Sequence, residues 1–471
     1  MKLYSKGAWR GGDESIEVIN PFDGQIVDTV PRATAQDVEE AIESAQRGAG
    51  DMKSLTGYER FEILSRATAL LRQRADEIAR TLSLEEGKPL AEALFEVDRS
   101  AQTLELSGEE AKRLSGEVLP LDGGKGVKNK LGFTLRVPCG VIAAIAPFNF
   151  PLNLVCHKVG PAIAAGNSVI LKPASDTPLV SLKLVEILLE AGLPPLGISC
   201  LTGSGSLIGE KICSDPRVRK ISFTGSKEVG ERICAVAGIK KVTMELGSNC
   251  PLVVLPDADL DEVANLAVSS AYTNAGQVCI SAQRLIVMES VREALIETMK
   301  PKVEALKVGD QLLEETGIGP MVRKSDASRV ESWIQEAVGD GAQLVCGGER
   351  DGALMQPTLL DVATPDMRVC REELFGPAVS VMSVSSIDEA IRLANDTEFG
   401  LSAGLFTKDI DAAMRFAREV DSGNIHINWG PLWRTDAMPY GGMKGSGMGK
   451  EGPKYAIEEM TEMKSVVIHS K

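Results

Sequence analysis

From Val141 onward, short apolar runs alternate with helical segments, and this alternation limits the possible folds more than any other feature. The runs Val141–Ala146 and Ser168–Leu171 are apolar almost throughout, and Pro178–Ala191 follows them with helical character. Strands that are apolar on both faces and alternate with helices indicate a parallel sheet covered by helices on both sides. A second alternating series starts at Leu252. The sequence therefore predicts two α/β units.

Helical patterns dominate the N-terminal part of the chain. Thr34 is a helix cap, and further helices are expected over Tyr58–Leu84 and Pro89–Arg113. Glycines then interrupt the chain before a strand-like run at Lys130–Val137. Near the C-terminus, Ile457–Ile468 is expected to form a helix turn followed by another strand. These two strand segments belong to neither α/β unit.

The overall charge argues against nucleic acid as a partner. Among 471 residues, 51 Lys and Arg against 66 Asp and Glu give a net charge of −15, whereas proteins that bind nucleic acid present a basic surface. The most apolar stretch, Val141–Cys156, is interrupted by prolines and asparagines. Because a membrane span needs about 20 mostly apolar residues, we expect no membrane partner either.

The cysteine and histidine content indicates a reducing compartment and chemistry without a metal. Nine cysteines occur, an odd number, and no two form a C-x-x-C pair. This usage is typical of reduced thiols in a cytosol. The N-terminal residues lack the apolar core of a secretory signal, which supports a cytoplasmic location. Three histidines cannot assemble a His-rich metal centre.

Two glycine-rich turns join strands to helices in the first α/β unit. Gly205 and Gly209 lie in one turn, and Gly225 and Ser226 lie in the other. Backbone N–H groups at a helix start can bind a pyrophosphate, although glycines also allow tight packing at such a junction. Two turns of this kind in one parallel sheet favour a dinucleotide-binding unit.

Three residues have settings that suit catalysis. Cys279 follows Gly276 closely and has small polar neighbours, so its thiol is either a nucleophile or a buried structural group. Glu245 ends an apolar strand, where a carboxylate is either hydrogen-bonded or a general base with a raised pKa. Asn149 lies in a rigid turn between two prolines, as a turn residue or as a donor to an oxyanion.

Six ordered motifs identify the chain as a member of the aldehyde dehydrogenase superfamily. The resemblance implies an α/β fold with a Rossmann-like cofactor-binding domain, an α/β catalytic domain and a small β-strand oligomerisation arm. The turn around Arg434 resembles the subgroup that oxidises lactaldehyde, phosphonoacetaldehyde and other short polar aldehydes. The motifs are Pro147–Pro151, Lys172–Ala174, Phe223–Ser226, Glu245–Gly247, Gly276–Cys279 and Glu372–Pro377.

The resemblance also implies domain boundaries and an assembly. The cofactor-binding domain comprises residues 1–116 and 138–246, the catalytic domain 247–447, and the arm 117–137 with 455–471. Exposed strand edges on such an arm are covered by pairing between subunits, so a homodimer or homotetramer is expected.

In the reaction that the resemblance implies, the Cys279 thiolate attacks the aldehyde. The Asn149 amide and the Cys279 backbone N–H hold the oxyanion of the thiohemiacetal. Hydride transfer to the nicotinamide leaves a thioester, and Glu245 activates the water that hydrolyses it.

The resemblance further implies which residues bind NAD or NADP. Lys172 is expected to reach the adenosine ribose and Glu373 the nicotinamide ribose. Ser175 stands where NAD-preferring members often carry a glutamate; a hydroxyl does not repel the 2′-phosphate of NADP, so both cofactors are expected. The remaining cofactor residues are Phe148, Phe375, Gly205, Gly209, Gly225 and Ser226.

A polar substrate pocket is expected from four residues, His157, Arg99, Arg434 and Tyr440. Together they could bind a hydroxylated or anionic short aldehyde, although each basic residue alone could be structural. Val278 stands where phosphate- and phosphonate-specific members carry an arginine, which disfavours those substrates.

Two other readings remain open from the residues. A thiol hydrolase or esterase could use Cys279 without a nicotinamide, with His157 as its base. A cofactor-binding scaffold without catalysis is the other, and the intact set of Cys279, Glu245 and Asn149 argues against it. Ester turnover without cofactor, in excess of aldehyde oxidation, would favour the hydrolase.

Overall fold

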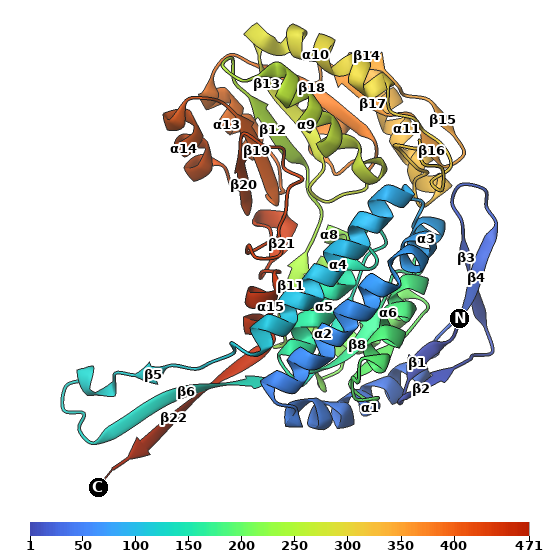
Figure 1. Ribbon diagram of the computed structural model, residues 1–471. Coiled ribbons are helices and arrows are strands. Elements are labelled where there is room, and N and C mark those ends of the chain that lie inside the picture. The colour runs from blue at the N-terminus through green and yellow to red at the C-terminus, as the bar shows by residue number, and fades with distance from the viewer. Residues whose placement is uncertain (471) are drawn as a thin grey trace.

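Two mostly parallel sheets form the centres of two lobes (Figure 1). The structure is a computed structural model, and it describes residues 1–470. The first sheet has eight strands in the order β2-β1-β9-β8-β7-β10-β11-β21, and the second has seven in the order β14-β17-β18-β13-β12-β19-β20. The predicted α/β fold class is thereby confirmed.

The inner strands of the first sheet are the continuous apolar runs of the sequence. β7 to β11 pair in parallel, whereas β1, β2 and β21 at the two edges are antiparallel to their neighbours. The strands are β1 (Leu3–Ser5), β2 (Ala8–Arg10), β7 (Val141–Ile145), β8 (Ser168–Lys172), β9 (Ile198–Cys200), β10 (Val218–Thr224), β11 (Lys241–Glu245) and β21 (Gly447–Met448).

Alternate residues of β7 face opposite helical layers. Val141, Ala143 and Ile145 pack with α1, α7 and α8, whereas Ile142 and Ala144 pack with helices α2 to α6. Helices therefore cover both faces of the sheet. They are α1 (Ala35–Ser54), α2 (Gly57–Gln73), α3 (Ala75–Glu86), α4 (Leu90–Ala111), α5 (Asn153–Ala164), α6 (Leu179–Glu190), α7 (Gly205–Ser214) and α8 (Lys227–Ala237).

The prediction of one continuous helix over Tyr58–Leu84 is wrong, because the structure has two helices, α2 and α3, in this region. Arg74 lies between them with φ −102° and ψ 18°, which interrupts the helical backbone. Both helices pack against α4. No glycine or proline occurs at the break, and the helical spacing of apolar residues continues across it, so the sequence predicts a single helix.

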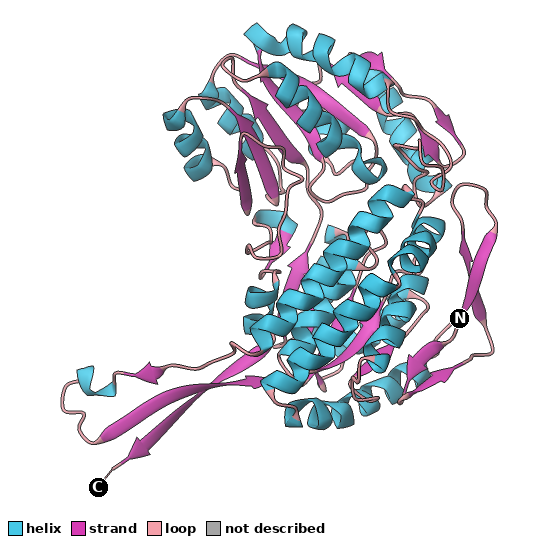
Figure 2. Ribbon diagram, in the orientation of Figure 1, coloured by secondary structure: helices cyan, strands magenta, loops and turns pink. Residues whose placement is uncertain are grey.

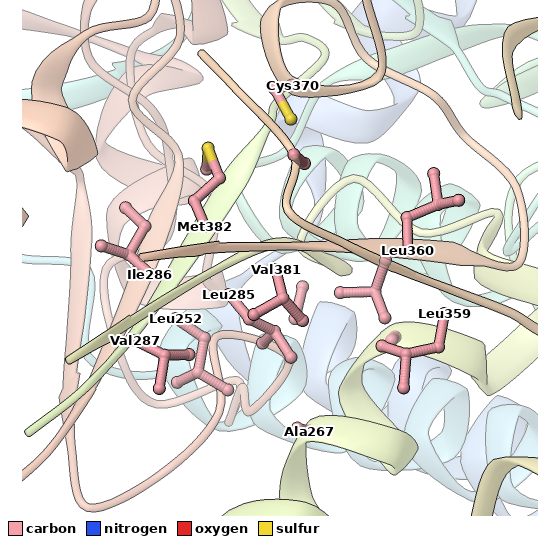
Figure 3. Packing of buried hydrophobic residues seen from close by; sticks show 14 of the residues in the cluster. Leu252, Ala267, Leu285, Ile286, Val287, Leu359, Leu360, Cys370, Val381 and Met382 are labelled. Atoms are coloured by element: carbon pink, nitrogen blue, oxygen red, sulfur yellow. The ribbon is translucent and has the colours of Figure 1, made fainter. Parts of the chain in front are cut away.

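The second sheet packs around a core of aliphatic side chains. Figure 3 shows Leu252, Leu285, Leu359 and Val381, from four neighbouring strands, close to Ala267 of α9. The strands are β12 (Cys250–Val254), β13 (Ala282–Met288), β14 (Gln343–Cys346), β17 (Thr358–Asp361), β18 (Ala378–Val384), β19 (Ser402–Phe406) and β20 (Asn424–Ile427). The helices are α9 (Leu260–Tyr272), α10 (Glu289–Glu304), α11 (Lys324–Gly339), α12 (Arg368–Arg371), α13 (Ile387–Asn395) and α14 (Ile410–Glu419).

A narrow strand arm extends away from both lobes and carries the C-terminal end of the chain (Figure 2). Its two long strands, β6 (Lys130–Pro138) and β22 (Thr461–His469), pair antiparallel along their whole length, and β5 (Val118–Leu119) adds to β6. Leu131 and Ile468 on these strands are about half exposed. Two hairpins lie elsewhere, β3 (Ser15–Ile19) with β4 (Ile26–Pro31), and β15 (Arg350–Asp351) with β16 (Leu354–Met355).

The chain returns from the second lobe to the edge of the first. Residues 440–452, which contain six glycines, include the short strand β21, in which Gly447 pairs with Glu245 of β11. Gly447 has φ 132°, and a Cβ there would overlap the carbonyl of Met244. Helix α15 (Pro453–Glu459) then packs on α5. The glycines of this segment therefore allow a strand to form as well as a turn.

A tight contact between two loops fixes the segment before Cys279. Gly276 ends the short 3₁₀ turn η2 (Thr273–Gly276) with φ 68°, and the two residues before it also have positive φ. A Cβ at Gly276 would overlap the carbonyl oxygen of Gly376. Only glycine allows this backbone conformation and this approach together.

Replacing Gly276 with alanine should therefore destabilise the protein. A left-handed conformation costs an L residue about 1–2 kcal/mol, and relief of the backbone overlap adds to this cost. Gly50→Ala in α1 is the matched control, because a Cβ there meets nothing within 4 Å and alanine should stabilise the helix by about 0.5–1 kcal/mol. Urea denaturation compares the two variants. A Gly276→Ala protein as stable as the unsubstituted chain would contradict the contact.

Candidate active site

A cavity of about 900 Å³ lies between the two lobes. Its walls come from the ends of β7 and β10, the first turns of α7 and α8, and the second-lobe segment 372–375 together with α11. Of the residues singled out from the sequence, it is lined by Asn149, Cys279, Phe148, Lys172, Gly205, Gly209, Gly225, Ser226, Glu373 and Phe375.

Cys279 lies on the loop between η2 and β13, with its thiol half-buried. Its Sγ is 3.3 Å from the hydroxyl oxygen of Tyr440, and its backbone carbonyl accepts a hydrogen bond from the Cys250 thiol at 3.7 Å. Burial raises the pKa of Cys279 to about 12, and the hydrogen bond with Tyr440 opposes this rise. The thiol is therefore protonated in the unliganded protein at neutral pH.

The Asn149 amide is tied to the loop that carries Cys279. Its Nδ2 donates to the carbonyl of Gln277 at 2.8 Å, and the side chain is buried. The backbone carbonyl of Asn149 accepts hydrogen bonds from Lys88 Nζ at 2.8 Å and from Asn274 Nδ2 at 3.1 Å. Both ends of the residue are thus held in place.

Sequence reasoning missed the buried ion pair that supports Asn149. Lys88 Nζ lies 2.5 Å from Glu96 Oε2 and 3.9 Å from the centre of the Phe150 ring, and both charged side chains are fully buried. Glu96 Oε1 accepts hydrogen bonds from the backbone N–H groups of Leu152 and Asn153. Lys88 stands in a charged run between two helices, a pattern that is usual for a solvated surface.

Glu245, at the end of β11, is buried, and among the described residues neither of its carboxylate oxygens has a hydrogen-bond partner. Burial, and then repulsion from Glu451, raise its pKa well above the ordinary value. A Cβ at Gly441 would lie 2.7 Å from Glu245 Oε1, so glycine leaves room beside the carboxylate. A buried, unpaired carboxyl group with a raised pKa suits a general base.

Glu451 has the opposite environment. Lys158 Nζ lies 2.9 Å from one carboxylate oxygen, and Arg434 donates to the other at 3.2 Å. Burial alone would raise the pKa of Glu451, but these two cations outweigh it and hold the pKa at about 2. Of the two neighbouring acids, Glu451 therefore ionises much more readily than Glu245.

The structure brings the four predicted substrate residues together. Arg99 on α4 forms an ion pair with Asp436, and His157 Nε2 on α5 lies 3.2 Å from the same carboxylate. Burial and the charge of Arg434 lower the pKa of His157, so its imidazole is neutral at pH 7 and Arg99 balances Asp436.

Arg434 links this group to Cys279. Its guanidinium lies 3.7 Å above the centre of the Tyr440 ring, and Nη2 is 3.2 Å from His157 Nδ1. Its Nε is buried and has no hydrogen-bond partner within residues 1–470. A free, buried donor beside an aromatic wall is available to a polar ligand.

Two further ionisable groups lie in the cavity wall: Lys172, which is buried, and Glu373, which is half-buried. Burial lowers the pKa of Lys172 to about 8, although Asp176 opposes the change. Burial likewise raises the pKa of Glu373 to about 7, although the backbone N–H of Ser248 donates to it at 2.9 Å.

The aromatic and hydroxyl residues predicted for cofactor binding have different surroundings. Phe148 and Phe375 meet edge to face, with ring centres 5.8 Å apart. Ser226 is the N-cap of α8, whose first turn lines the cavity. Ser175 is the exception among the predicted cofactor residues: its hydroxyl donates to the carbonyl of Gly203 at 2.9 Å, and it lies outside the cavity lining. Glu245 and the four predicted substrate residues also lie outside this lining.

Fold and site together are those of an α/β enzyme with a candidate thiol nucleophile in the wall of the cavity between the lobes and a buried carboxyl group, Glu245, as the candidate general base. The model of the aldehyde dehydrogenase family matches residues 9–466, and the chain belongs to this family. Within residues 1–470, no helix is long and apolar enough to cross a membrane, and no group of three or more His, Cys, Asp or Glu could hold a metal ion.

Similar proteins include enzymes with named substrates. The chain is 48% identical to 3-sulfolactaldehyde dehydrogenase of Priestia aryabhattai over 467 residues. This alignment covers 99% of this chain and 98% of that protein. It is 38% identical over 473 residues to lactaldehyde dehydrogenase of Methanococcus aeolicus, with both chains fully covered. An NADP complex of glyceraldehyde-3-phosphate dehydrogenase from Methanocaldococcus jannaschii superposes with a TM-score of 0.94, at 38% identity, over 97% of this chain and 100% of that one.

Removal of Lys88 alone should be much more damaging than removal of the ion pair. Lys88→Met leaves Glu96 buried without its partner, which costs about 3–5 kcal/mol of stability. The double variant Lys88→Met with Glu96→Gln keeps an acceptor for the two backbone N–H groups and should recover most of this loss. Urea denaturation measures both. Equal stability of the single and double variants would contradict the assigned ion pair.

Proposed function

We propose that this aldehyde dehydrogenase oxidises a short hydroxylated or anionic aldehyde to its carboxylate, with NAD or NADP as the hydride acceptor. The observation that carries the proposal is the position of Cys279. It lines the long cavity, and its sulfur contacts Tyr440 of the group that contains His157, Arg99 and Arg434. A thiol in this position can react with an aldehyde on one side and face a cofactor on the other.

The cavity fits a dinucleotide in chemical character. Helices α7 and α8 begin in its wall, and helix N-termini favour phosphate groups. Lys172 supplies a buried donor and Glu373 a half-buried acceptor suited to ribose hydroxyls, while Phe148 and Phe375 supply apolar surface. When bound, the nicotinamide ring accepts a hydride.

The proposed first step forms a bond between Cys279 Sγ and the carbonyl carbon of the aldehyde, after the thiol has lost its proton. The carbonyl oxygen then becomes an oxyanion. The Asn149 side-chain amide and the Cys279 backbone N–H are the donors proposed to stabilise it. Support comes from the hydrogen bond of Asn149 to Gln277, which fixes the amide beside the cysteine loop.

Once the thiohemiacetal carbon has given its hydride to bound nicotinamide, the carbon–oxygen double bond re-forms and a thioester to Cys279 remains. The proposed second step hydrolyses this thioester. Glu245 accepts a proton from water, the water oxygen attacks the thioester carbon, and the bond to Cys279 Sγ breaks. The carboxylate product leaves, and the thiol is restored. The absence of a hydrogen-bond partner for either Glu245 oxygen among the described residues supports this role, because the carboxylate is free to bind water.

The charges around His157 support an anionic or hydroxylated substrate. The group contains one more positive than negative charge, and the Arg434 Nε donor has no partner among the described residues. The similar proteins named for 3-sulfolactaldehyde and lactaldehyde act on short polar aldehydes of this type. The charged residues are Arg99, Lys158 and Arg434 against Asp436 and Glu451.

Both nicotinamide cofactors are proposed to bind. Ser175 carries no charge that would repel the 2′-phosphate of NADP, and a structurally similar enzyme was solved as a complex with NADP.

We propose the domain division given by the family resemblance, with the exposed edges of the arm pairing in a homodimer or homotetramer. All nine cysteines are free thiols, which supports a cytoplasmic location.

The proposal is tested by the formation of NADH or NADPH across a panel of aldehydes with each cofactor. Lactaldehyde, glyceraldehyde, sulfolactaldehyde and succinic semialdehyde should be oxidised faster than benzaldehyde, and Cys279→Ala should remove at least about 10³-fold of the activity. Best turnover on benzaldehyde would end the polar-pocket assignment. Ester turnover without cofactor, in excess of any aldehyde oxidation, would favour a thiol hydrolase instead.

Glu245→Gln should separate the two chemical steps. We expect one equivalent of reduced cofactor per active site in a rapid burst, followed by turnover slowed by about 10²-fold or more because the thioester persists. In the unsubstituted enzyme, the rate of hydrolysis should rise with pH through the raised pKa of Glu245, since the deprotonated carboxylate is the active form. Stopped-flow absorbance measures both. Unchanged steady-state turnover would contradict the role.

A further inference from the structure

Tyr440, one of the predicted substrate residues, contacts the Cys279 sulfur through its hydroxyl. Its hydroxyl oxygen lies 3.3 Å from Sγ, and the tyrosine is buried, with 3% of its surface exposed. If Tyr440 only lined the substrate pocket, its ring would be sufficient and its hydroxyl would not be needed. We propose that the Tyr440 hydroxyl is a catalytic group that donates a hydrogen bond to the Cys279 thiolate and thereby favours formation of the nucleophile.

The direction of this hydrogen bond follows from the chemistry of the two groups. A thiolate has no proton to give, so once Cys279 ionises the phenol must be the donor. Burial raises the pKa of Tyr440 well above its ordinary value, so the phenol keeps its proton over the working pH range. No proton is transferred: the oxygen retains it, and the negative charge stays on sulfur.

Arg434 should strengthen the donor. Its guanidinium lies 3.7 Å above the centre of the Tyr440 ring and places a positive charge next to the phenol. A phenol beside a cation is more acidic and donates a stronger hydrogen bond. Arg434 is itself held by Glu451, so its position over the ring is fixed.

The backbone also holds Tyr440 in place. Its N–H donates to the carbonyl of Glu451 at 3.1 Å, and the N–H of Glu451 donates back to the carbonyl of Tyr440 at 2.7 Å. Glu451 is fixed by Lys158 and Arg434. The hydroxyl is therefore presented to the sulfur by a rigid segment, as expected for a group that acts on a reacting atom.

The other ionisable groups around the thiol work against ionisation. Glu245 on β11, Glu373 on the segment before β18 and the Cys250 thiol on β12 each raise the pKa of Cys279, as does burial itself. Tyr440 lowers it. In surroundings that otherwise disfavour the thiolate, a single donor has a large influence on the ionised fraction.

The test is the pH profile of Cys279 alkylation by iodoacetamide in the cofactor-free enzyme, followed by mass spectrometry of the peptide that contains it. Tyr440→Phe keeps the ring and removes the hydroxyl. Loss of one hydrogen bond to a charged group should move the profile by about one pH unit to higher pH. At neutral pH, alkylation should slow about threefold, because the thiolate becomes tenfold scarcer but more nucleophilic.

Tyr4→Phe is the matched control. It removes another tyrosine hydroxyl, bonded at 3.1 Å to the carbonyl of Pro195 and remote from the cavity, and should leave the profile unchanged. Thermal unfolding of both variants shows that each is folded. A Tyr440→Phe profile that stays in place or moves to lower pH would overturn the inference and reduce Tyr440 to a pocket wall.

The inference rests on the proposed role of Cys279, and the two can fail separately. Aldehyde oxidation that persists in Cys279→Ala would end the proposed function, whatever the alkylation profile shows. Oxidation that requires Cys279, together with an unchanged alkylation profile in Tyr440→Phe, would end the inference alone.

Discussion

The pairing of β21 with β11 is the contact on which the arrangement of the site depends. It joins Gly447, on a segment that has crossed from the second lobe, to Glu245 at the edge of the first sheet. Because of this return, Tyr440 lies beside Cys279, 161 positions earlier in the chain, and Glu451 lies beside Lys158, 293 positions earlier. Without this pairing, Glu245, Glu451 and Tyr440 would not lie together beside Cys279.

The site consists of buried ionisable groups whose charges are balanced by neighbouring groups to different degrees. Glu451 receives two cations and stays charged, whereas Glu245 receives no hydrogen bond from the described residues and has a raised pKa. The surroundings thereby shift the pKa values of two carboxyl groups of the same chemistry in opposite directions. The same principle applies to Lys88, which is fully paired and serves as support, and to Lys172, which lies in the cavity wall.

The fold could be predicted from the sequence to the extent that local patterns determined it. The apolar runs at β7, β8 and β12 indicated parallel strands because strands covered on both faces have no polar side. The break at Arg74 could not be found, since no residue there disfavours a helix and the turn serves packing against α4. The strand β21 was hidden among glycines, whose freedom is compatible with a loop or with a close strand pair.

For the site, the sequence by itself determined the identity and order of the chemical groups. The motifs containing Asn149, Glu245 and Cys279 can be recognised because each lies in a short segment with its own local character. Only the tertiary structure decided which groups touch and what state they adopt. Tyr440 meets Cys279, Asp436 joins Arg99 to His157, and Ser175 turns to Gly203. The physical reason is that pKa values and hydrogen bonds depend on distance and burial, which are set by segments far apart in the chain.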